Sequence, residues 1–272
     1  MESAASPLPI WEDQPVSELP SKSGAQTVER AIAILNLFRD AQVSLGITSI
    51  ARQTGLNLTT AHRLVRTLVG EHFMEQDPAN EQYRLGPALA VLGRRAVEGS
   101  GIDRARATTD RLSEATGESV SVGVRGSRGV LVVLQSSSRH ALRFEHPAGG
   151  AIDVHASAMG KVLLAFGETA PTATIRELGP LARFTPSTIT TRAAMLTELE
   201  RVRADGFATN RQERYDGVCG VAAPALDAAG VARLAVGIQG PSVRLTDARL
   251  LELGPLLVAT GREVAELVLG GR

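Results

Sequence analysis

Apolar residues recur at helical spacing from Gln26 onward, and this pattern predicts the first helix. Its apolar face would consist of Val28, Ala31, Ile32, Leu35 and Phe38. Residues 1–24 have no such pattern and mix Ser, Pro and acidic residues. We therefore expect a flexible tail before the first helix.

Two further helices are predicted in close succession. Thr48 is the expected N-cap of a short helix with Ile50 and Ala51 on its inner face. Gly55 would supply the left-handed residue that closes this helix. Asn57 would then cap a third helix, whose apolar stripe consists of Leu58, Ala61, Leu64, Val65, Leu68 and Val69.

A β-hairpin is predicted directly after the third helix. Residues 73–76 and 82–85 resemble short strands and flank turn-forming residues at 77–80. Residues 87–106 are rich in Ala, Leu, Val and Arg, which predicts a helix interrupted near 99–101. We interpret this helix as the connector to a second domain.

Helices and strands alternate in the remaining sequence. Hairpins are predicted at 120–135 and 218–239, with turns at 125–129 and 227–230. Helices are predicted at 157–166, 192–204 and 246–269. The pattern indicates an antiparallel sheet with helices packed on it, an α+β fold.

Length and composition favour two globular domains. The chain has 272 residues, of which 43% are hydrophobic and 21% charged, so two cores are expected. We expect a flexible tail at 1–24, a winged helix-turn-helix domain at 25–87, a linker helix at 88–101 and an effector-binding domain at 102–271. The single cysteine gives no disulfide framework. Without an apolar run of roughly 18 residues or a signal peptide, we expect a cytoplasmic protein with no membrane partner.

Overall charge gives no support to nucleic-acid binding, because 29 basic residues balance 29 acidic ones. Residues 41–70, however, contain three arginines and no acid. The outward face of the third helix carries Thr59, Thr60, His62, Arg63, Arg66 and Thr67. A solvated surface helix could have this face too, but a capped helix before it and a hairpin after it favour insertion into the major groove of double-stranded DNA.

Other arginines are weaker candidates for contacts with DNA. Arg84 near the end of the hairpin would lie along a phosphate backbone or in the minor groove, although an exposed strand charge explains it equally well. Arg52 and Arg30 are further candidates for phosphate contacts.

An enzyme and a protein-interaction module are the alternative readings. His155 and Cys219 could belong to a catalytic set, but the chain lacks a nucleophile elbow, a zinc-protease helix and a phosphate-binding loop. His155 is better explained as ordering the backbone before its helix. The histidines match no strong metal-ligand spacing, so we expect no catalytic residue, no metal and no cofactor.

Several segments together resemble the IclR-type transcriptional regulators. In the first domain these are TVERAIAILNLF, ITSIARQTGLNLTTAHRLVRTLVGEHFM and YRLG. In the second domain they are HASAMGKVLLA, GFATNRQE, GVCGVAAPALDAAG and LAVGIQGPSVRLT. The resemblance runs in order through everything after residue 24. It implies a GAF-like sensing domain, a homodimer or homotetramer, and control of catabolic or related operons.

The resemblance also implies where a small organic effector binds. The site would form where the helix beginning at Ser157 meets strands that carry Asn210, Gly220, Gly237 and Gln239, with Ala158 and Met159 at the helix start and Cys219 as a further candidate next to Gly220. Free backbone N–H groups there suit an anion such as a carboxylate.

This chain departs from the family pattern within that site. The family usually has cysteine at the position of Gly220, whereas here the cysteine is Cys219, which should point to the opposite face of its strand. Relatives that bind small acids carry hydroxyl or acidic groups where this chain has Gly237, Gln239 and Asn210. We expect a roomier, less charged pocket and an effector larger than a two-carbon acid, such as an aromatic or amide-bearing metabolite.

A dimer would present two recognition helices, so the operator should be a palindrome with half-sites about one helical turn, roughly 34 Å, or a multiple apart. We expect repression of a catabolic operon, with the direction of control depending on where the operator lies relative to the promoter.

Overall fold

The computed structural model describes residues 23–38, 44–126, 129–145 and 151–270. These residues fall into two compact units, with the boundary between Gly99 and Ser100. The predicted tail at residues 1–24 lies outside the described residues as far as residue 22. The first helix already begins at Ser23.

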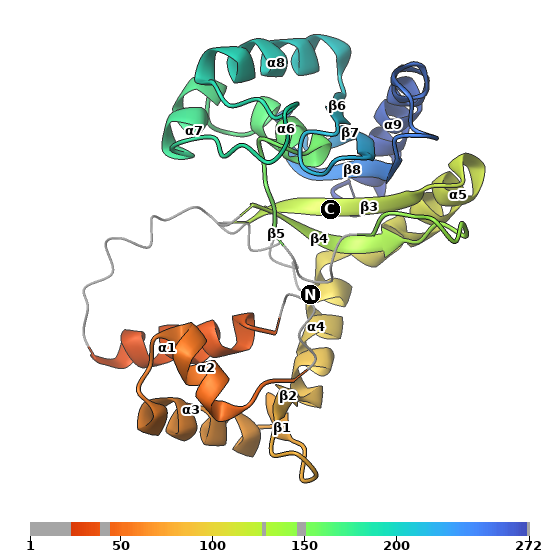
Figure 1. Cartoon of the computed structure of the whole chain (residues 1–272). Helices are drawn as coiled ribbons and strands as arrows, with labels where there is room; N and C mark the ends of the chain where they lie inside the picture. The colour runs from red at the N-terminus through yellow and green to blue at the C-terminus, as the bar shows by residue number, and fades with distance from the viewer. Residues whose placement is uncertain (1–22, 39–43, 127–128, 146–150, 271–272) are drawn as a thin grey trace, which may run out of the picture. The chain divides into compact units, whose positions relative to one another are not determined.

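The first unit is a three-helix core followed by a two-stranded hairpin (Figure 1). Its elements are α1 (Ser23–Asn36), α2 (Ile47–Thr54), α3 (Leu58–Gly70), β1 (Met74–Gln76), β2 (Tyr83–Leu85) and α4 (Pro87–Ser100). The core is formed by buried apolar side chains of α1, α2, α3 and the hairpin, among them Ile34, Ile50, Val65 and Met74. None of the residues of α4, all of which are described, is buried.

Two predictions about this unit are wrong in detail. Thr48 lies inside α2 and caps nothing, because the helix begins at Ile47 after Gly46, whose extended backbone serves as the N-cap without a side-chain bond. In α1, Val28 and Ile32 are 59% and 52% exposed, while Ile34 is fully buried. The apolar residues of α1 therefore occupy two faces, of which only one meets the core of the unit.

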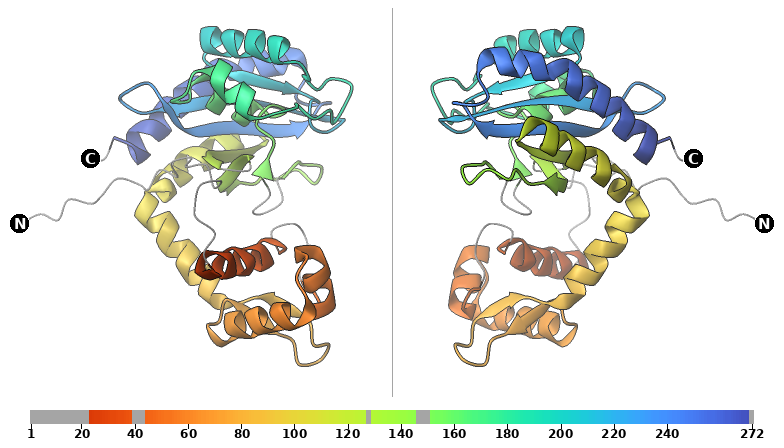
Figure 2. Two further views of the ribbon diagram at one scale, coloured as in Figure 1. Left: turned by 90° about the vertical axis from the view of Figure 1, so that its left-hand side faces the viewer. Right: turned by 90° about the vertical axis from the view of Figure 1, so that its right-hand side faces the viewer.

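The second unit is a six-stranded antiparallel sheet with helices on both faces (Figure 2). The strand order is β5-β4-β3-β8-β7-β6. Its strands are β3 (Ser119–Gly126), β4 (Gly129–Ser136), β5 (Ala151–Ile152), β6 (Ala208–Arg211), β7 (Val218–Leu226) and β8 (Ala232–Pro241). Its helices are the 3₁₀ turn η2 (Ile102–Ala105) and the α-helices α5 (Arg106–Thr116), α6 (Ala158–Ala165), α7 (Pro171–Glu177), α8 (Arg192–Asp205) and α9 (Asp247–Val268).

Each face of this sheet has its own apolar core. Val221, Val236 and Ile238 pack with α5 and α9 on one face. Ala222 and Ala235 pack with α6, α7 and α8 on the other. The predicted α+β class, with an N-terminal helix-turn-helix and a C-terminal antiparallel sheet, is confirmed. The sequence analysis missed α5, α7 and β5, and it expected a strand at Asn210, in β6, only from the family resemblance.

Close backbone packing fixes α6 over the sheet. A Cβ atom on Gly160 would lie 2.2 Å from the carbonyl oxygen of Val154, so only glycine fits at this point of the helix. Ser157 caps the helix, since its Oγ accepts a hydrogen bond from the Gly160 N–H at 3.1 Å. The start of α6 is therefore held firmly against the segment that precedes it.

Candidate nucleic-acid interface and effector site

A capped turn fixes the direction of α3. Gly55 adopts the left-handed conformation with φ of +68°, as predicted. The Thr60 N–H donates to Asn57 Oδ1 at 2.8 Å, which confirms Asn57 as the N-cap. Ala61 and Val65 are fully buried on the inner side of the helix. The turn and this packing together leave the opposite side of α3 in solvent.

The outer side of α3 is an open depression with basic and hydroxyl groups. It is lined by Thr59, His62, Arg63, Arg66 and Thr67. All five residues are exposed, whereas Thr60 is half-buried at the cap. Within the described part of the chain, the side chains of Arg63 and Arg66 form no hydrogen bond or ion pair, so their guanidinium groups are available to a ligand. The sequence analysis placed Thr67 on this face but left it out of the candidate contacts.

The predicted β-hairpin is present, but its arginine, Arg84, is paired with a carboxylate. Glu75 and Arg84 face each other across the two strands, and Arg84 donates from Nη2 and Nε to Glu75 Oε2 at 2.9 and 3.0 Å. A carboxylate this close compensates much of the positive charge that a phosphate would meet. Arg52 is exposed in the last turn of α2, and Arg30 is half-buried in α1.

Residues predicted for the effector site meet at the start of α6. Ala158 and Met159 are fully buried there. A Cβ on Gly237 would lie 2.8 Å from Met159 Cγ, and one on Gly123 would lie 3.3 Å from Met159 Sδ. The expectation of a roomier site over Gly237 is therefore wrong at this point, because the Met159 side chain fills the room that the missing side chain leaves.

A polar row crosses the sheet beside that apolar contact. Asn210, Gly220, Gln239 and Ser119 lie opposite one another on β6, β7, β8 and β3. Asn210 Oδ1 accepts the Glu213 N–H at 2.8 Å. The Gln239 side chain lies over Gly220, since a Cβ on that glycine would be 3.0 Å from Gln239 Cγ. The structure thus brings Asn210, Gly220 and Gln239 together.

Cys219 lies apart from this row. It belongs to the apolar core on the α9 side of the sheet, so its side chain points away from the face that carries Gly220, as the one-residue shift predicts. Burial raises the pKa of the Cys219 thiol, which keeps it protonated and unreactive at neutral pH.

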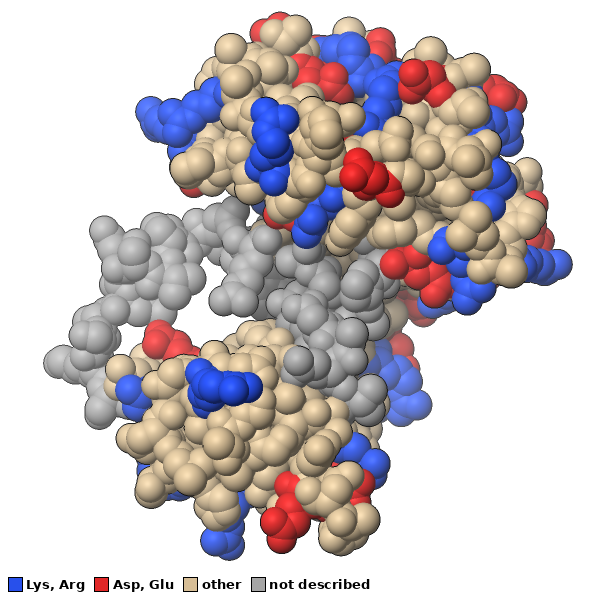
Figure 3. All heavy atoms as spheres, viewed as in Figure 1, with Lys and Arg blue, Asp and Glu red and all other residues tan. Residues whose placement is uncertain are grey.

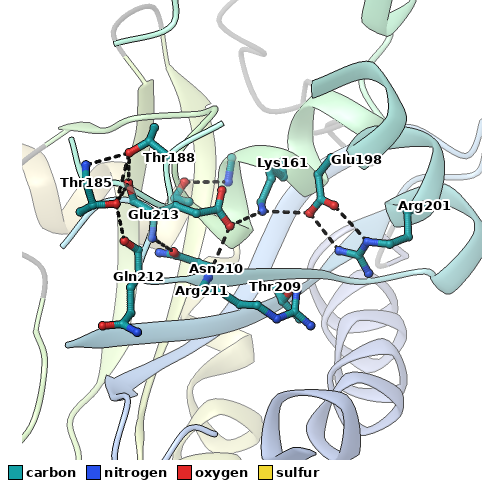
Figure 4. Close-up of polar contacts among 12 residues, drawn as sticks. Lys161, Thr185, Thr188, Glu198, Arg201, Thr209, Asn210, Arg211, Gln212 and Glu213 are labelled. Carbon is teal, nitrogen blue, oxygen red and sulfur yellow. Dashed lines mark hydrogen bonds and ion pairs between the residues drawn. The ribbon is translucent and has the colours of Figure 1, made fainter. Parts of the chain in front are cut away.

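A buried ion cluster beside the polar row was missed by the sequence analysis (Figure 4). Lys161 on α6 is 1% exposed and donates to Glu198 Oε1 at 2.9 Å and to Glu213 Oε1 at 2.7 Å. Although burial opposes ionisation of Glu198, hydrogen bonds from Arg201 and the charge of Lys161 lower its pKa. A lysine inside the apolar stretch AMGKVLLAF was the available signal, because such a lysine must find partners when it is buried.

The segment after β6 is held in an unusual turn by hydroxyl groups. Gln212 has φ of +58°. Its carbonyl oxygen accepts from Thr185 Oγ1 at 2.7 Å, and the carbonyl oxygen of Glu213 accepts from Thr188 Oγ1 at 2.6 Å. Because these contacts fix the backbone on both sides of the turn, the Glu213 carboxyl group is directed at Lys161 (Figure 4).

His155 and Arg214 organise neighbouring loops. His155 Nε2 is 2.9 Å from the carbonyl oxygen of Ala182, and its ring stacks on Phe184. Arg214 lies 3.9 Å over the Phe184 ring and pairs with Asp153 at 2.7 Å. These contacts give His155 an ordering role in the loop around Ala182, and not in the backbone before its own helix as predicted. Among the described residues, no group of three metal-binding side chains comes together, and no helix is long and apolar enough to cross a membrane.

Comparison with known proteins gives matches over both units. Residues 27–78 match the IclR helix-turn-helix domain, and residues 98–266 match the bacterial transcriptional regulator IclR C-terminal domain. The HTH-type transcriptional regulator BhcR of Paracoccus denitrificans (strain Pd 1222) is 32% identical over 243 residues, which cover 89% of this chain and 87% of that protein. The glycerol operon regulatory protein of Streptomyces griseus is 37% identical over 222 residues, covering 81% and 86%.

Solved structures share the same fold. The crystal structure of an IclR transcriptional regulator from Alicyclobacillus acidocaldarius aligns with a TM-score of 0.81. The alignment covers 89% of this chain and 98% of that one, at 24% sequence identity. The likeness therefore extends over the DNA-binding and the C-terminal unit alike.

Proposed function

Because the chain belongs to the IclR family of bacterial transcriptional regulators, we propose that it represses a catabolic operon by binding a palindromic operator, and that a small organic effector controls this binding. The family is one of regulators and not of enzymes. The observation that carries the proposal is the exposed basic and hydroxyl face of α3, where Arg63 and Arg66 have no side-chain partner among the described residues. A relative that regulates a glycerol operon supports the catabolic assignment.

The contacts with DNA are assigned by chemistry and exposure. The guanidinium groups of Arg63 and Arg66 have no partner among the described residues and can bridge the O6 and N7 acceptors of guanine in the major groove. Thr59 and His62 reach neighbouring base edges or phosphates from the same face. Thr60 donates its N–H to the cap and offers only its hydroxyl group. The phosphate contacts are made by Arg52, and by Arg84 where a phosphate displaces Glu75 from it.

A homo-oligomer follows from exposed apolar side chains in the first unit. Val28 and Ile32 on α1 and Val91 and Leu92 on α4 are each more than half exposed. A second copy of the chain would cover such surfaces and would supply the second recognition helix that a palindrome requires. We assign residues 25–87 to the DNA-binding domain, 88–101 to the linker helix and 102–271 to the effector-binding domain.

The effector is assigned to the α6 face of the sheet, where Ala158, Met159, Asn210, Gly220, Gly237 and Gln239 gather. Cys219 would not contact the effector and would pack β7 against the core on the α9 side of the sheet. An effector changes operator affinity only if it binds the DNA-competent and the incompetent arrangement unequally. The linker helix α4 joins the DNA-binding domain to the effector-binding domain along the chain, so we assign it the role of transmitting the difference. Since its target is the chromosome, we assign the protein to the cytoplasm.

Removing the two free arginines tests the DNA interface. With an operator selected from a random DNA pool, Arg63→Ala plus Arg66→Ala should weaken specific binding by more than about tenfold, because each bidentate contact to guanine contributes roughly 1–3 kcal/mol of discrimination. If these residues also neutralise phosphates, the slope of log affinity against log salt falls by about 0.9 per lost contact. Gel-shift titrations at several salt concentrations measure both quantities.

The matched control is Arg192→Ala, which removes an exposed arginine from α8 in the other unit. It should bind the operator like the wild type. Unchanged operator binding by the α3 double variant would reject this interface, whereas failure of the wild type to select any sequence from the pool would favour a protein-interaction module.

A further inference from the structure

Two buried oxygen atoms on the α6 face have no hydrogen-bond partner within the described residues. They are Glu213 Oε2 and Gln239 Oε1. The two residues are only 5% and 6% exposed. Buried acceptors are nearly always paired, because an unpaired one loses its hydration without compensation. Both atoms therefore indicate a donor that comes from outside the described residues.

The register of the sheet brings these two oxygens to the same place. Gln239 lies opposite Gly220, which in turn lies opposite Asn210, and neighbouring strands are about 4.8 Å apart. Asn210 Oδ1 accepts a hydrogen bond from the Glu213 N–H, which places Glu213 beside Asn210 at one end of this row. Gly220 has no side chain to separate the two ends. The two unpaired oxygens thus belong to residues at the two ends of the Asn210–Gly220–Gln239 row, and the Gln239 side chain extends over Gly220 between them.

The charges around Glu213 decide which kind of donor fits. Lys161 and Arg201 carry two positive charges and pair with the carboxylates of Glu198 and Glu213, while Arg201 also pairs with Asp205 nearer the surface (Figure 4). An anionic group brought to Glu213 Oε2 would meet a carboxylate oxygen and no donor. A cation there would share one buried carboxylate with the Lys161 ammonium, and the repulsion between the two positive charges is costly. A neutral N–H or O–H group satisfies the oxygen and leaves these charges unchanged.

We propose that the effector of this regulator presents a neutral hydrogen-bond donor, an amide N–H or a hydroxyl group, to Glu213 Oε2, and a second donor to Gln239 Oε1. The proposal rests on the assignment of the α6 face as the effector site. It adds the chemical class of the effector's recognised group, and it makes Glu213 a specificity residue. A carboxylate on the same effector would have to bind away from Glu213.

Matched pairs of compounds test this class without knowledge of the natural effector. The probes are benzamide with N,N-dimethylbenzamide, and glycerol with its trimethyl ether. Each pair differs in whether N–H or O–H donors are present. Binding to the full-length protein is measured by calorimetry and by the shift in Tm. At least one donor-bearing member should bind about tenfold more tightly than its methylated counterpart, as expected for a hydrogen bond to a charged acceptor.

Glu213→Gln reverses the polarity of the site. Lys161 Nζ can only donate, so the carbonyl oxygen of the new side chain must face it. The amide NH₂ then replaces Oε2, and the tenfold preference for donors should disappear. Glu198→Gln is the matched control, because it also removes a carboxylate partner of Lys161 but leaves Glu213 Oε2 unchanged. Its preference should equal that of the wild type.

Gln239→Leu provides a second variant that leaves the ion cluster intact, in case Glu213→Gln does not fold. It should reduce the preference to a few-fold, because only one of the two acceptors is lost. If the wild type binds no donor-bearing probe, or binds both members of every pair equally, the proposal is overturned and a buried water is the partner of these oxygens. A preference that survives in Glu213→Gln also overturns it.

Operator binding is measured in parallel to separate this inference from the proposed function. If the protein binds DNA but shows no preference for donor-bearing probes, the inference is rejected and the proposed function is retained. If it shows the preference but selects no DNA sequence, the proposed function is rejected and a donor-specific binding site is retained.

Discussion

At the scale of single residues, the Met159 side chain occupies the space that a side chain at Gly237 would otherwise fill. The sequence analysis interpreted the glycine as extra room in the effector site, but a Cβ there would come within 2.8 Å of Met159 Cγ and 3.3 Å of Ala222 Cβ. Methionine is flexible and fills irregular space well. An effector that enters at this point must therefore first move the Met159 side chain.

Gly237→Ala tests this contact. The new methyl group overpacks the site, so the free energy of unfolding should fall by about 1–3 kcal/mol. With Met159→Ala in the background, the same substitution should cost less than about 0.5 kcal/mol, because the space is then free. Denaturant unfolding of the four proteins of this cycle gives both values. Equal costs in the two backgrounds would mean that Met159 is not what fills the space.

The ion pairs of Lys161 could not be predicted from the sequence. Its two partners are 37 and 52 residues away, so no local spacing predicts them. The lysine would have been expected on the surface by its residue type, yet it is almost fully buried. The outward positions of His62, Arg63 and Arg66 were predictable, because helical periodicity alone determines which side of α3 they occupy.

At the scale of elements, caps and turns explain which boundaries were predictable. Asn57 and Gly55 act through bonds and backbone angles within a few residues, and both were identified correctly. The start of α2 was wrong because Thr48 has the residue type of a cap, whereas the extended backbone of Gly46 decides where the helix begins. β6 is four residues long and has no periodicity of its own, so only its pairing with β7 makes it a strand.

Asn57→Ala tests the cap of α3. Loss of the bond to the Thr60 N–H should destabilise the helix start by about 1 kcal/mol. Hydrogen exchange of the Thr60 amide should then be faster by roughly fivefold, if it exchanges by local opening. Asn57→Asp keeps the acceptor and should exchange like the wild type. If the alanine variant exchanges at the wild-type rate, the cap does not stabilise this end of α3.

At the scale of the whole molecule, charge gave little guidance to function. Acidic and basic side chains are interspersed on the face of the second unit seen in Figure 3, and the total charge is zero. Local structure was more informative than the total, because folding gathers Arg63 and Arg66 without an acidic partner on one side of α3. The two-domain division was predictable from length and from the change in pattern near residue 100.

The linker helix α4 has 14 residues and contains Gly93 and Gly99, and none of its residues is fully buried by the described part of the chain. Helices of this length are marginal in water when nothing packs against them. Amide exchange in residues 87–100 should therefore slow as protein concentration rises and copies associate. Exchange in the buried strand β8 should not depend on concentration and serves as the internal reference. Concentration-independent exchange in α4 would show that the helix is stable in a single copy.

The largely exposed surface of α4 makes communication between the two domains a property of the oligomer. If the helix is ordered only when copies of the chain associate, the effector-binding domain can influence the DNA-binding domain only in the assembled regulator. At low protein concentration the copies separate, so the response to the effector would be lost together with the operator affinity that depends on two recognition helices.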